Sequence, residues 1–243
     1  IDPLKARAQH DAFMEIYRDN GVKVIELGEV GAPLPNAYFC RDTFCMTPDG
    51  AVMSRMASAS RAGEERFAAA ALAHEGVPIV HSVDGEGTFE GADVVVANED
   101  LVFVGLGMRS NRSGVKQVAR AFRDAGVAEV IEVEIPYGCG HIDGCINVID
   151  KDLAMVMPTQ LSWVVYENLK RHSFTVIDLP DMAESQGGMA LNIVPLQPRT
   201  VVTPAGNVKT KALLEQHGVE VIEVDVSELM KGGGSCHCMT GVV

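Results

Sequence analysis

The chain has 243 residues, a formal net charge of −13 and a hydrophobic fraction of 47%. This apolar content excludes a disordered chain, and no apolar run approaches the roughly 20 residues that a bilayer span requires. The acidic balance, without a Lys/Arg cluster, argues against a nucleic-acid binder. We therefore expect a soluble, cytoplasmic protein whose partners include no nucleic acid and no membrane.

A helical pattern that ends at a small residue and leads into a β-branched run occurs five times along the chain. The small residues, in chain order, are Gly21, Gly76, Gly126, Ser173 and Gly218. They stand 55, 50, 47 and 45 residues apart, so the unit has a nearly constant length. A left-handed helix C-cap favours glycine, and alternating Val and Ile predict strands at 22–25, 77–80, 127–131, 174–177 and 219–222.

Paired apolar runs, each with a central turn, lie between these small residues and predict hairpins. They cover 43–55, 93–106, 145–157 and 190–203. A fifth hairpin would start near Cys238 and finish before residue 1, so we expect a chain truncated at both ends. We predict an α/β fold in which residues 1–243 form one domain, a five-bladed, pseudo-fivefold α/β propeller whose fifth blade is incomplete. A doubly wound sheet is the alternative, but its Gly-rich phosphate loop is not found.

Cysteines fall in three close pairs in this chain. The pairs are Cys40 with Cys45, Cys139 with Cys145, and Cys236 with Cys238. Because reducing compartments keep thiols free and a chain of this size needs no disulfide bonds for stability, we interpret all six cysteines as thiols.

Polar residues recur where these hairpins begin. Asp42, Glu90, His141 and Cys238 are separated by 48, 51 and 97 residues, which match one, one and two repeats. Asp143 follows His141 by two residues. Because equivalent positions in a ring of units lie at one end of its axis, we expect these side chains to converge.

The chemistry of this set is that of covalent catalysis on a cationic carbon. A thiolate at Cys238 is a nucleophile, and His141 passes protons near neutral pH while Glu90 orients it. The carboxylates of Asp42 and Asp143 can bracket a guanidinium by charge-assisted hydrogen bonds.

Four short segments carry a resemblance to a known superfamily. They are Leu34 to Asp42 (LPNAYFCRD), Phe89 to Asp93 (FEGAD), His141 to Asp143 (HID) and Gly232 to Thr240 (GGGSCHCMT). The chain is similar over its whole length to the guanidino-group-modifying enzymes, or penteins, which include arginine deiminases, dimethylarginine hydrolases and amidinotransferases. It departs from arginine deiminases in lacking their helical insertion and in having Gly232–Gly234 where they have an Arg.

The resemblance implies a fold, a reaction and a set of site residues. It implies Cys238 as nucleophile with His141, Glu90, Asp42 and Asp143, and no cofactor and no metal. Further substrate contacts that it implies are Asn36, Arg61, Arg109 and Asp93, with the two arginines on the substrate's α-carboxylate. The implied partner is a small cationic guanidino substrate, and a homo-oligomer is compatible with it.

Several functions agree with these residues. The first is a hydrolase of the guanidino group of arginine or a relative, and the second is an amidinotransferase that uses the same side chains. A third interpretation is a zinc site formed by Cys139, His141, Cys145, Cys236 and Cys238, although the spacing of Cys236 and Cys238 is tighter than is usual for zinc. A non-catalytic binding relative is the fourth.

Overall fold

The computed structural model describes residues 1–28, 30 and 34–243. The described residues form four three-stranded sheets. Their strands are β1 (Phe44–Thr47), β2 (Gly50–Met53) and β3 (Ile79–Ser82); β4 (Val94–Val96), β5 (Leu101–Leu106) and β6 (Glu129–Glu134); β7 (Ile146–Asp150), β8 (Leu153–Val156) and β9 (Thr175–Asp178); and β10 (Val194–Gln197), β11 (Thr200–Pro204) and β12 (Glu220–Val224). In each sheet the first two strands pair antiparallel and the third pairs parallel to the second.

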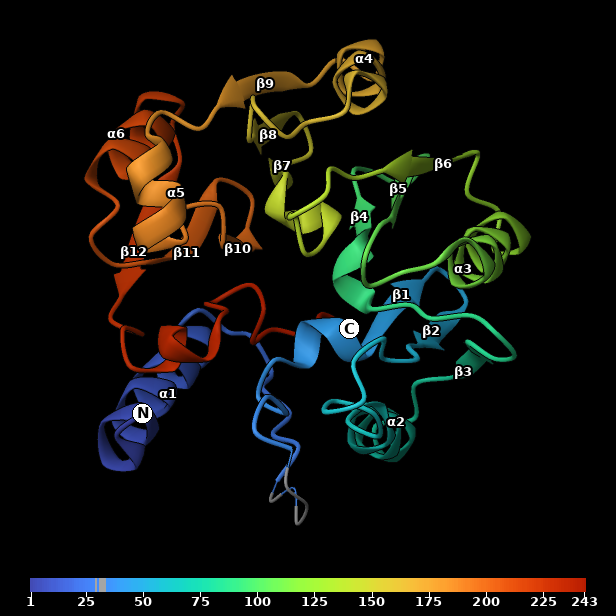
Figure 1. Cartoon of the computed structure of the whole chain (residues 1–243). Helices are drawn as coiled ribbons and strands as arrows, with labels where there is room; N and C mark the ends of the chain where they lie inside the picture. The colour runs from blue at the N-terminus through green and yellow to red at the C-terminus, as the bar shows by residue number, and fades with distance from the viewer. Residues whose placement is uncertain (29, 31–33) are drawn as a thin grey trace.

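Six α-helices accompany these sheets within the described residues. They are α1 (Pro3–Asp19), α2 (Glu65–His74), α3 (Arg112–Asp124), α4 (Trp163–Arg171), α5 (Met182–Gly188) and α6 (Val208–Gln216). The sheets surround a common centre, and the helices lie on the outside (Figure 1). The predicted unit of hairpin, helix and strand is confirmed four times. All five predicted C-cap residues have a positive φ, from 66° at Ser173 to 90° at Gly126.

The fifth unit differs from the sequence prediction, because the described residues contain four sheets and not five. Residues 22–25 form no strand although α1 precedes them as expected. A strand needs a hydrogen-bonding neighbour, and the hairpin that would supply it does not occur among the described residues. The side chains of Val22 and Val24 pack instead on the apolar cluster of α1 and the C-terminal segment.

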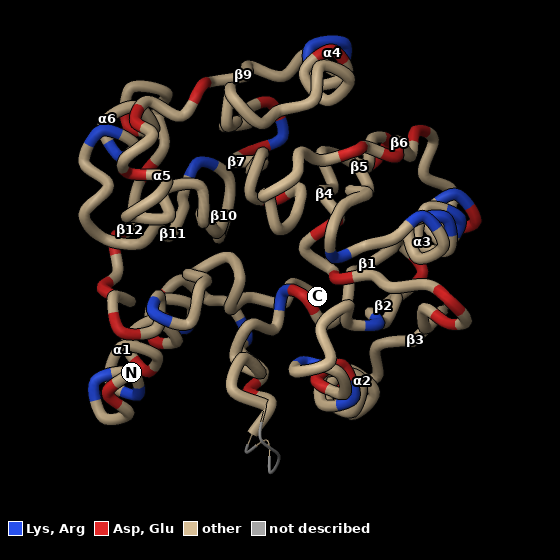
Figure 2. Tube along the Cα trace, in the orientation of Figure 1, with Lys and Arg blue, Asp and Glu red and all other residues tan. Residues whose placement is uncertain are grey.

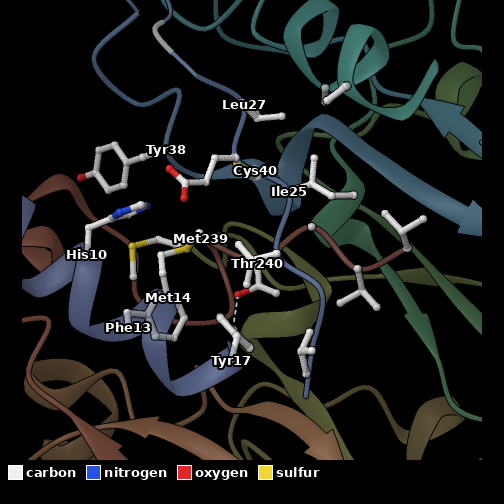
Figure 3. Close-up of a pocket in the computed structure, with 18 of the residues that line it drawn as sticks. His10, Phe13, Met14, Tyr17, Ile25, Leu27, Tyr38, Cys40, Met239 and Thr240 are labelled. Atoms are coloured by element: carbon white, nitrogen blue, oxygen red, sulfur yellow. Dashed lines mark hydrogen bonds between the residues drawn. The ribbon is translucent and has the colours of Figure 1, made fainter. Parts of the chain in front are cut away.

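A cavity of about 810 Å³ lies beside this incomplete unit. Figure 3 shows Phe13, Met14 and Tyr17 of α1 facing it together with Met239 and Thr240 from the end of the chain. The hydroxyls of Tyr17 and Thr240 are 2.6 Å apart, which ties the first helix to the last residues. The two ends of the described chain therefore pack together.

Short 3₁₀ helices place the polar residues at the centre. They are η1 (Cys40–Thr43), η2 (Gly91–Asp93) and η3 (Ile142–Gly144), directly before β1, β4 and β7, and η4 (Leu229–Gly232) near the end of the chain. The backbones pack so closely that a Cβ on Gly91 would stand 2.0 Å from the carbonyl oxygen of Phe44. Equivalent turns of successive units thus meet at one place, as the repeat predicted.

Charged residues are concentrated on the outer elements. Figure 2 shows Lys and Arg gathered on helices such as α3, whereas acidic residues also occur toward the centre, near the C-terminus. Among the described residues, no helix has the length and apolar content to cross a bilayer.

Candidate active site

The carboxylates of Asp42 and Glu90 meet the imidazole of His141 at the junction of η1, η2 and η3. Nε2 of His141 lies 2.7 Å from Oε2 of Glu90, and Nδ1 lies 3.9 Å from Oδ1 of Asp42. Glu90 is fully buried, and Asp42 is 4% exposed. Since buried carboxylates are costly unless paired, this cluster is a site held together by charge.

The protonation of His141 follows from these neighbours. Burial opposes the charged imidazole, but the hydrogen bond to Glu90 and the charges of Asp42, Asp93 and Asp143 raise the pKa of His141 to about 10. Burial acts to raise the pKa of Glu90, yet the hydrogen bond from His141 lowers it overall. The pair is therefore an imidazolium and a carboxylate at neutral pH, which suits His141 to donate a proton.

Arg61 lies deeper than the resemblance implied. Its guanidinium donates to Oδ2 of Asp42 at 2.5 Å and to Oε2 of Glu64 at 2.7 Å from Nη2, and the residue is 6% exposed. Nη1 of Arg61 also lies 3.9 Å from Oε2 of Glu90. The arginine thus contacts candidate catalytic carboxylates in this structure, and its contact with a substrate's α-carboxylate stays a prediction.

The other oxygen of Asp42 has a different environment. Oδ1 is buried and has no hydrogen-bond partner among the described residues. Burial raises the pKa of Asp42, against the lowering effects of His141 and Arg61. An acceptor buried beside an imidazolium and left without a donor is a place where a cationic ligand can bind.

Cys238 carries the thiol that lies next to this cluster. Its Sγ and its backbone N each bond Oδ1 of Asn192, at 3.1 and 3.2 Å. Burial, followed by the charges of Asp143 and Asp42, raises the pKa of Cys238 to about 12. Because burial and both carboxylates disfavour the thiolate, the neutral thiol is the favoured form of Cys238.

Asp143 is joined to the thiol segment by a histidine. Oδ2 of Asp143 lies 3.0 Å from Nδ1 of His237 and 3.9 Å from Nε of Arg41. Burial would raise the pKa of Asp143, but the hydrogen bond and the charge of His237 lower it overall. The backbone N of Arg41 also donates to the carbonyl of Cys238 at 3.1 Å, so the segments of Asp42 and Cys238 are tied together.

Asp93 lies behind the cluster rather than in it. Its Oδ2 accepts from Oγ of Ser110 at 2.5 Å, and its Oδ1 accepts from the backbone N of Ile142 at 3.0 Å. Burial raises its pKa to about 7. Both oxygens are thus used by the protein, and the arrangement positions the turn of His141, whereas the resemblance implied a substrate contact.

The remaining predicted contacts lie nearer the surface. Nη1 of Arg109 is 3.6 Å from Oε1 of Glu90, and its side chain is about one third exposed. Asn36 is half-buried in the turn before η1, where its carbonyl accepts from the N of Phe39 at 2.9 Å. Of these two residues, Arg109 reaches the cluster directly.

Asp42, Glu90 and His141 together also form a donor set that would suit a metal ion, since one atom from each lies within 4.8 Å of the others. Hydrogen bonds from Arg61 and His141 already serve two of these oxygens. The predicted zinc set is not formed by the described residues, because the single candidate group that they contain includes no cysteine.

Two residues of this site escaped the sequence prediction. Asn192 stands 51 residues after His141 and 46 before Cys238, so the repeat spacing that found the others also marks it as the member from the fourth unit. His237 lies inside the segment before the nucleophile, but nothing in its spacing assigns its contact with Asp143.

Comparison with known proteins extends over nearly the whole chain. Residues 3–243 match the family model described as N,N dimethylarginine dimethylhydrolase, eukaryotic. An uncharacterized protein of Aeropyrum pernix is 30% identical over 238 residues, which cover 97% of this chain and 83% of that protein. An arginine deiminase of Bacillus cytotoxicus is 27% identical over 251 residues, which cover 86% of this chain but 61% of the deiminase.

A solved structure has the same fold. The dimethylarginine dimethylaminohydrolase from Pseudomonas aeruginosa, as a cysteine-to-serine variant complexed with citrulline, superposes with a TM-score of 0.80. The match covers 98% of this chain and 88% of the other at 23% identity.

Proposed function

The chain belongs to the N,N dimethylarginine dimethylhydrolase family of the guanidino-group-modifying superfamily, and from that premise we propose that it hydrolyses a guanidino group. The observation that carries the proposal is the meeting of three groups. The imidazole of His141 lies 3.9 Å from the carboxylate of Asp42, and the backbone N of the adjoining Arg41 donates to the carbonyl of Cys238 at 3.1 Å.

Asp42 anchors the substrate in this proposal. A guanidinium presents paired N–H donors that match a carboxylate, and its charge offsets the cluster of buried carboxylates. Oδ1 of Asp42 accepts one donor directly, whereas Oδ2 becomes free only when Arg61 leaves it. Asp143 is the second carboxylate that faces the thiol, and Asn36, Arg61 and Arg109 are proposed to contact the rest of the substrate.

Cys238 forms the covalent intermediate. The cation of a bound guanidinium favours loss of the Cys238 proton to solvent, and the thiolate then attacks the guanidinium carbon. His141 gives its proton to the departing nitrogen, so ammonia or an amine leaves and a thiouronium-type adduct remains on Cys238. The same imidazole, held by Glu90, then takes a proton from water as the water attacks, and the C–S bond breaks to release the thiolate, which regains a proton from solvent after the product leaves.

Arginine and its methylated relatives are the proposed substrates. The relatives are named for hydrolysis of arginine or dimethylarginine, which favours water as the acceptor over the amine used by an amidinotransferase. Citrulline, the compound bound by the Pseudomonas aeruginosa relative, is the product expected from such a hydrolysis. The proposal needs no cofactor and no metal.

We also infer that residues 1–243 act as one catalytic domain with five α/β repeats. Four repeats have sheets, and α1 with the C-terminal segment stands where a fifth repeat belongs. The contact of Tyr17 with Thr240 supports a ring closed by these two segments.

A substrate screen tests the function. Purified protein is incubated with arginine, methylated arginines, agmatine and guanidino acids, and the products are identified by mass. We expect a citrulline-type or urea-type product together with ammonia or an amine from at least one compound. No product from any of them would overturn the assignment.

A further inference from the structure

Two thiols outside the reaction flank the turn that carries His141 and Asp143. Cys139 and Cys145 are free cysteines, 7% and 2% exposed, and their Sγ atoms are 3.1 Å apart. Six residues separate them, and η3 lies between them. Any bond between these sulfurs would close a short loop around two candidate catalytic side chains.

The two thiols are chemically unequal. The contact between the two sulfurs, in which either can be the donor, is the largest influence on the pKa of Cys139 and lowers it. The same contact, together with burial, raises the pKa of Cys145. The sulfur contact thus favours a thiolate at one of the two cysteines, and the thiolate is the form that reacts with oxidants.

The segment that leads into Cys139 is exposed. Tyr137, two residues before Cys139, is fully exposed, and a Cβ built on Gly138 or Gly140 would meet no atom within 4 Å. Cys139, itself 7% exposed, lies within this exposed segment, and an oxidant that reaches its sulfur must be small.

We propose that Cys139 and Cys145 are an oxidative modification site, which a hydroperoxide converts to a disulfide. The Cys139 thiolate attacks one peroxide oxygen, which breaks the O–O bond and gives a sulfenic acid and, after protonation, one molecule of water or alcohol. The Cys145 thiol then attacks that sulfur, the S–S bond forms, and a second molecule, water, leaves. Two thiols are oxidised, and one peroxide is reduced.

The modification changes the site through the turn. A disulfide brings the sulfurs to about 2.05 Å, a contraction of about 1 Å. His141 holds Glu90 at 2.7 Å and Asp143 holds His237 at 3.0 Å, so a shift of this size at the ends of the turn disturbs both contacts. Misplacement by about 1 Å costs an enzyme up to about 100-fold in rate, and we expect a loss of at least about tenfold.

Peptide mass tests the bond without reference to activity. The tryptic peptide 124–151 contains Cys139 and Cys145 and no other cysteine. The Cys238→Ser protein is treated with hydrogen peroxide, blocked and digested. We expect this peptide to lose two hydrogens and to regain them with dithiothreitol, also when Cys236→Ser is added as the matched control. An unchanged peptide, or one that only gains oxygen, would overturn the proposal, as would the same loss in Cys139→Ser.

Activity tests the consequence. The effect on the reaction rests on the proposed function, whereas the peptide result does not, so failure of one is distinguishable from failure of the other. We expect peroxide to reduce the turnover of the natural chain reversibly and to reduce that of Cys145→Ser much less. Equal losses in the two proteins would contradict a switch at this pair.

Discussion

The two sides of the candidate site are built differently. On one side, Asp42, Glu90, His141 and Arg61 form charged hydrogen bonds with one another and are buried together. On the other side, the thiol of Cys238 meets the neutral amide oxygen of Asn192 and the repulsive field of two carboxylates. The first side holds its charges in mutual pairs except at Oδ1 of Asp42, whereas the second places a neutral thiol near two carboxylates.

This difference indicates how a bound substrate can activate the thiol that attacks it. Burial is the main cause of the raised pKa of Cys238, and the carboxylates that would hold a guanidinium, Asp143 and Asp42, raise it further. A bound cation offsets that field and favours the thiolate, so reactivity appears where the substrate is. The central claim is therefore that the positive charge of the bound substrate lowers the pKa of the Cys238 thiol.

The largest expected effect on activity is the difference between substitution of Cys238 and substitution of the neighbouring Cys236. We expect Cys238→Ser to reduce kcat by at least about 10³-fold, because the hydroxyl is a far weaker nucleophile at this position. Cys236 is fully buried and its thiol pKa is raised by burial to about 12, so Cys236→Ser should keep most of the activity. Product formation measured for both variants decides, and a reversed order would mean that we have chosen the wrong sulfur.

The next largest effect on activity is expected from Glu90, the hydrogen-bond partner of His141. Glu90→Gln keeps the shape but removes the charge that raises the pKa of His141, and we expect kcat to fall by about 100-fold. The pH at which the imidazole loses its proton should also move down from about 10. Glu64→Gln removes another buried carboxylate without a contact to His141 and is the matched control. Equal pH profiles for the two variants would contradict the role of Glu90.

The position of Arg61 predicts an internal competitor for the substrate. Because its guanidinium occupies Oδ2 of Asp42, we expect Arg61→Ala to bind guanidinium ion several-fold more tightly, as measured by calorimetry. Arg109→Ala removes a charge 3.6 Å from Glu90 and supplies the control for a general field effect. If both variants gain affinity equally, Arg61 does not compete at Asp42.

The pH dependence of stability gives a smaller effect. His141 has a folded pKa near 10, above its unfolded value, so its contribution is fully present below about pH 6.5 and is lost as the pH rises toward 10. The free energy of unfolding of the natural chain should exceed that of His141→Gln at pH 6.5, by up to a few kcal/mol, and this gap should narrow by pH 10. A gap that widens with pH would contradict the raised pKa. Denaturant titrations at several pH values measure it.

Periodicity made much of this molecule predictable. The hairpins and the positive φ of Ser173 follow from local chemistry repeated at a constant interval, and that interval also located Asp42, Glu90 and His141. The strand predicted at 22–25 does not form among the described residues, because a strand needs a neighbouring strand to accept and donate its hydrogen bonds. Helix α5 was missed because it interrupts the unit, although Asp181 caps it by accepting from the N of Ala183.

Side-chain pairing was the part that sequence did not predict. Spacing places a residue at the centre but does not say which partner it takes, so Arg61 was expected on a substrate carboxylate and lies against Asp42. Asp93 was expected to face substrate and supports the turn of His141. Both outcomes depend on which charges are buried together, and that becomes visible only once the units are closed around the centre.

The thiolate absorbance of Cys238 tests the central claim most directly. The ultraviolet thiolate signal is titrated up to pH 10 with and without guanidinium ion, and the signal of Cys238→Ser is subtracted. We predict almost no thiolate without the ion, in keeping with a pKa of about 12, and an about tenfold larger thiolate signal at pH 10 with the ion bound, which corresponds to a pKa about one unit lower. Identical titrations with and without guanidinium ion would contradict the claim.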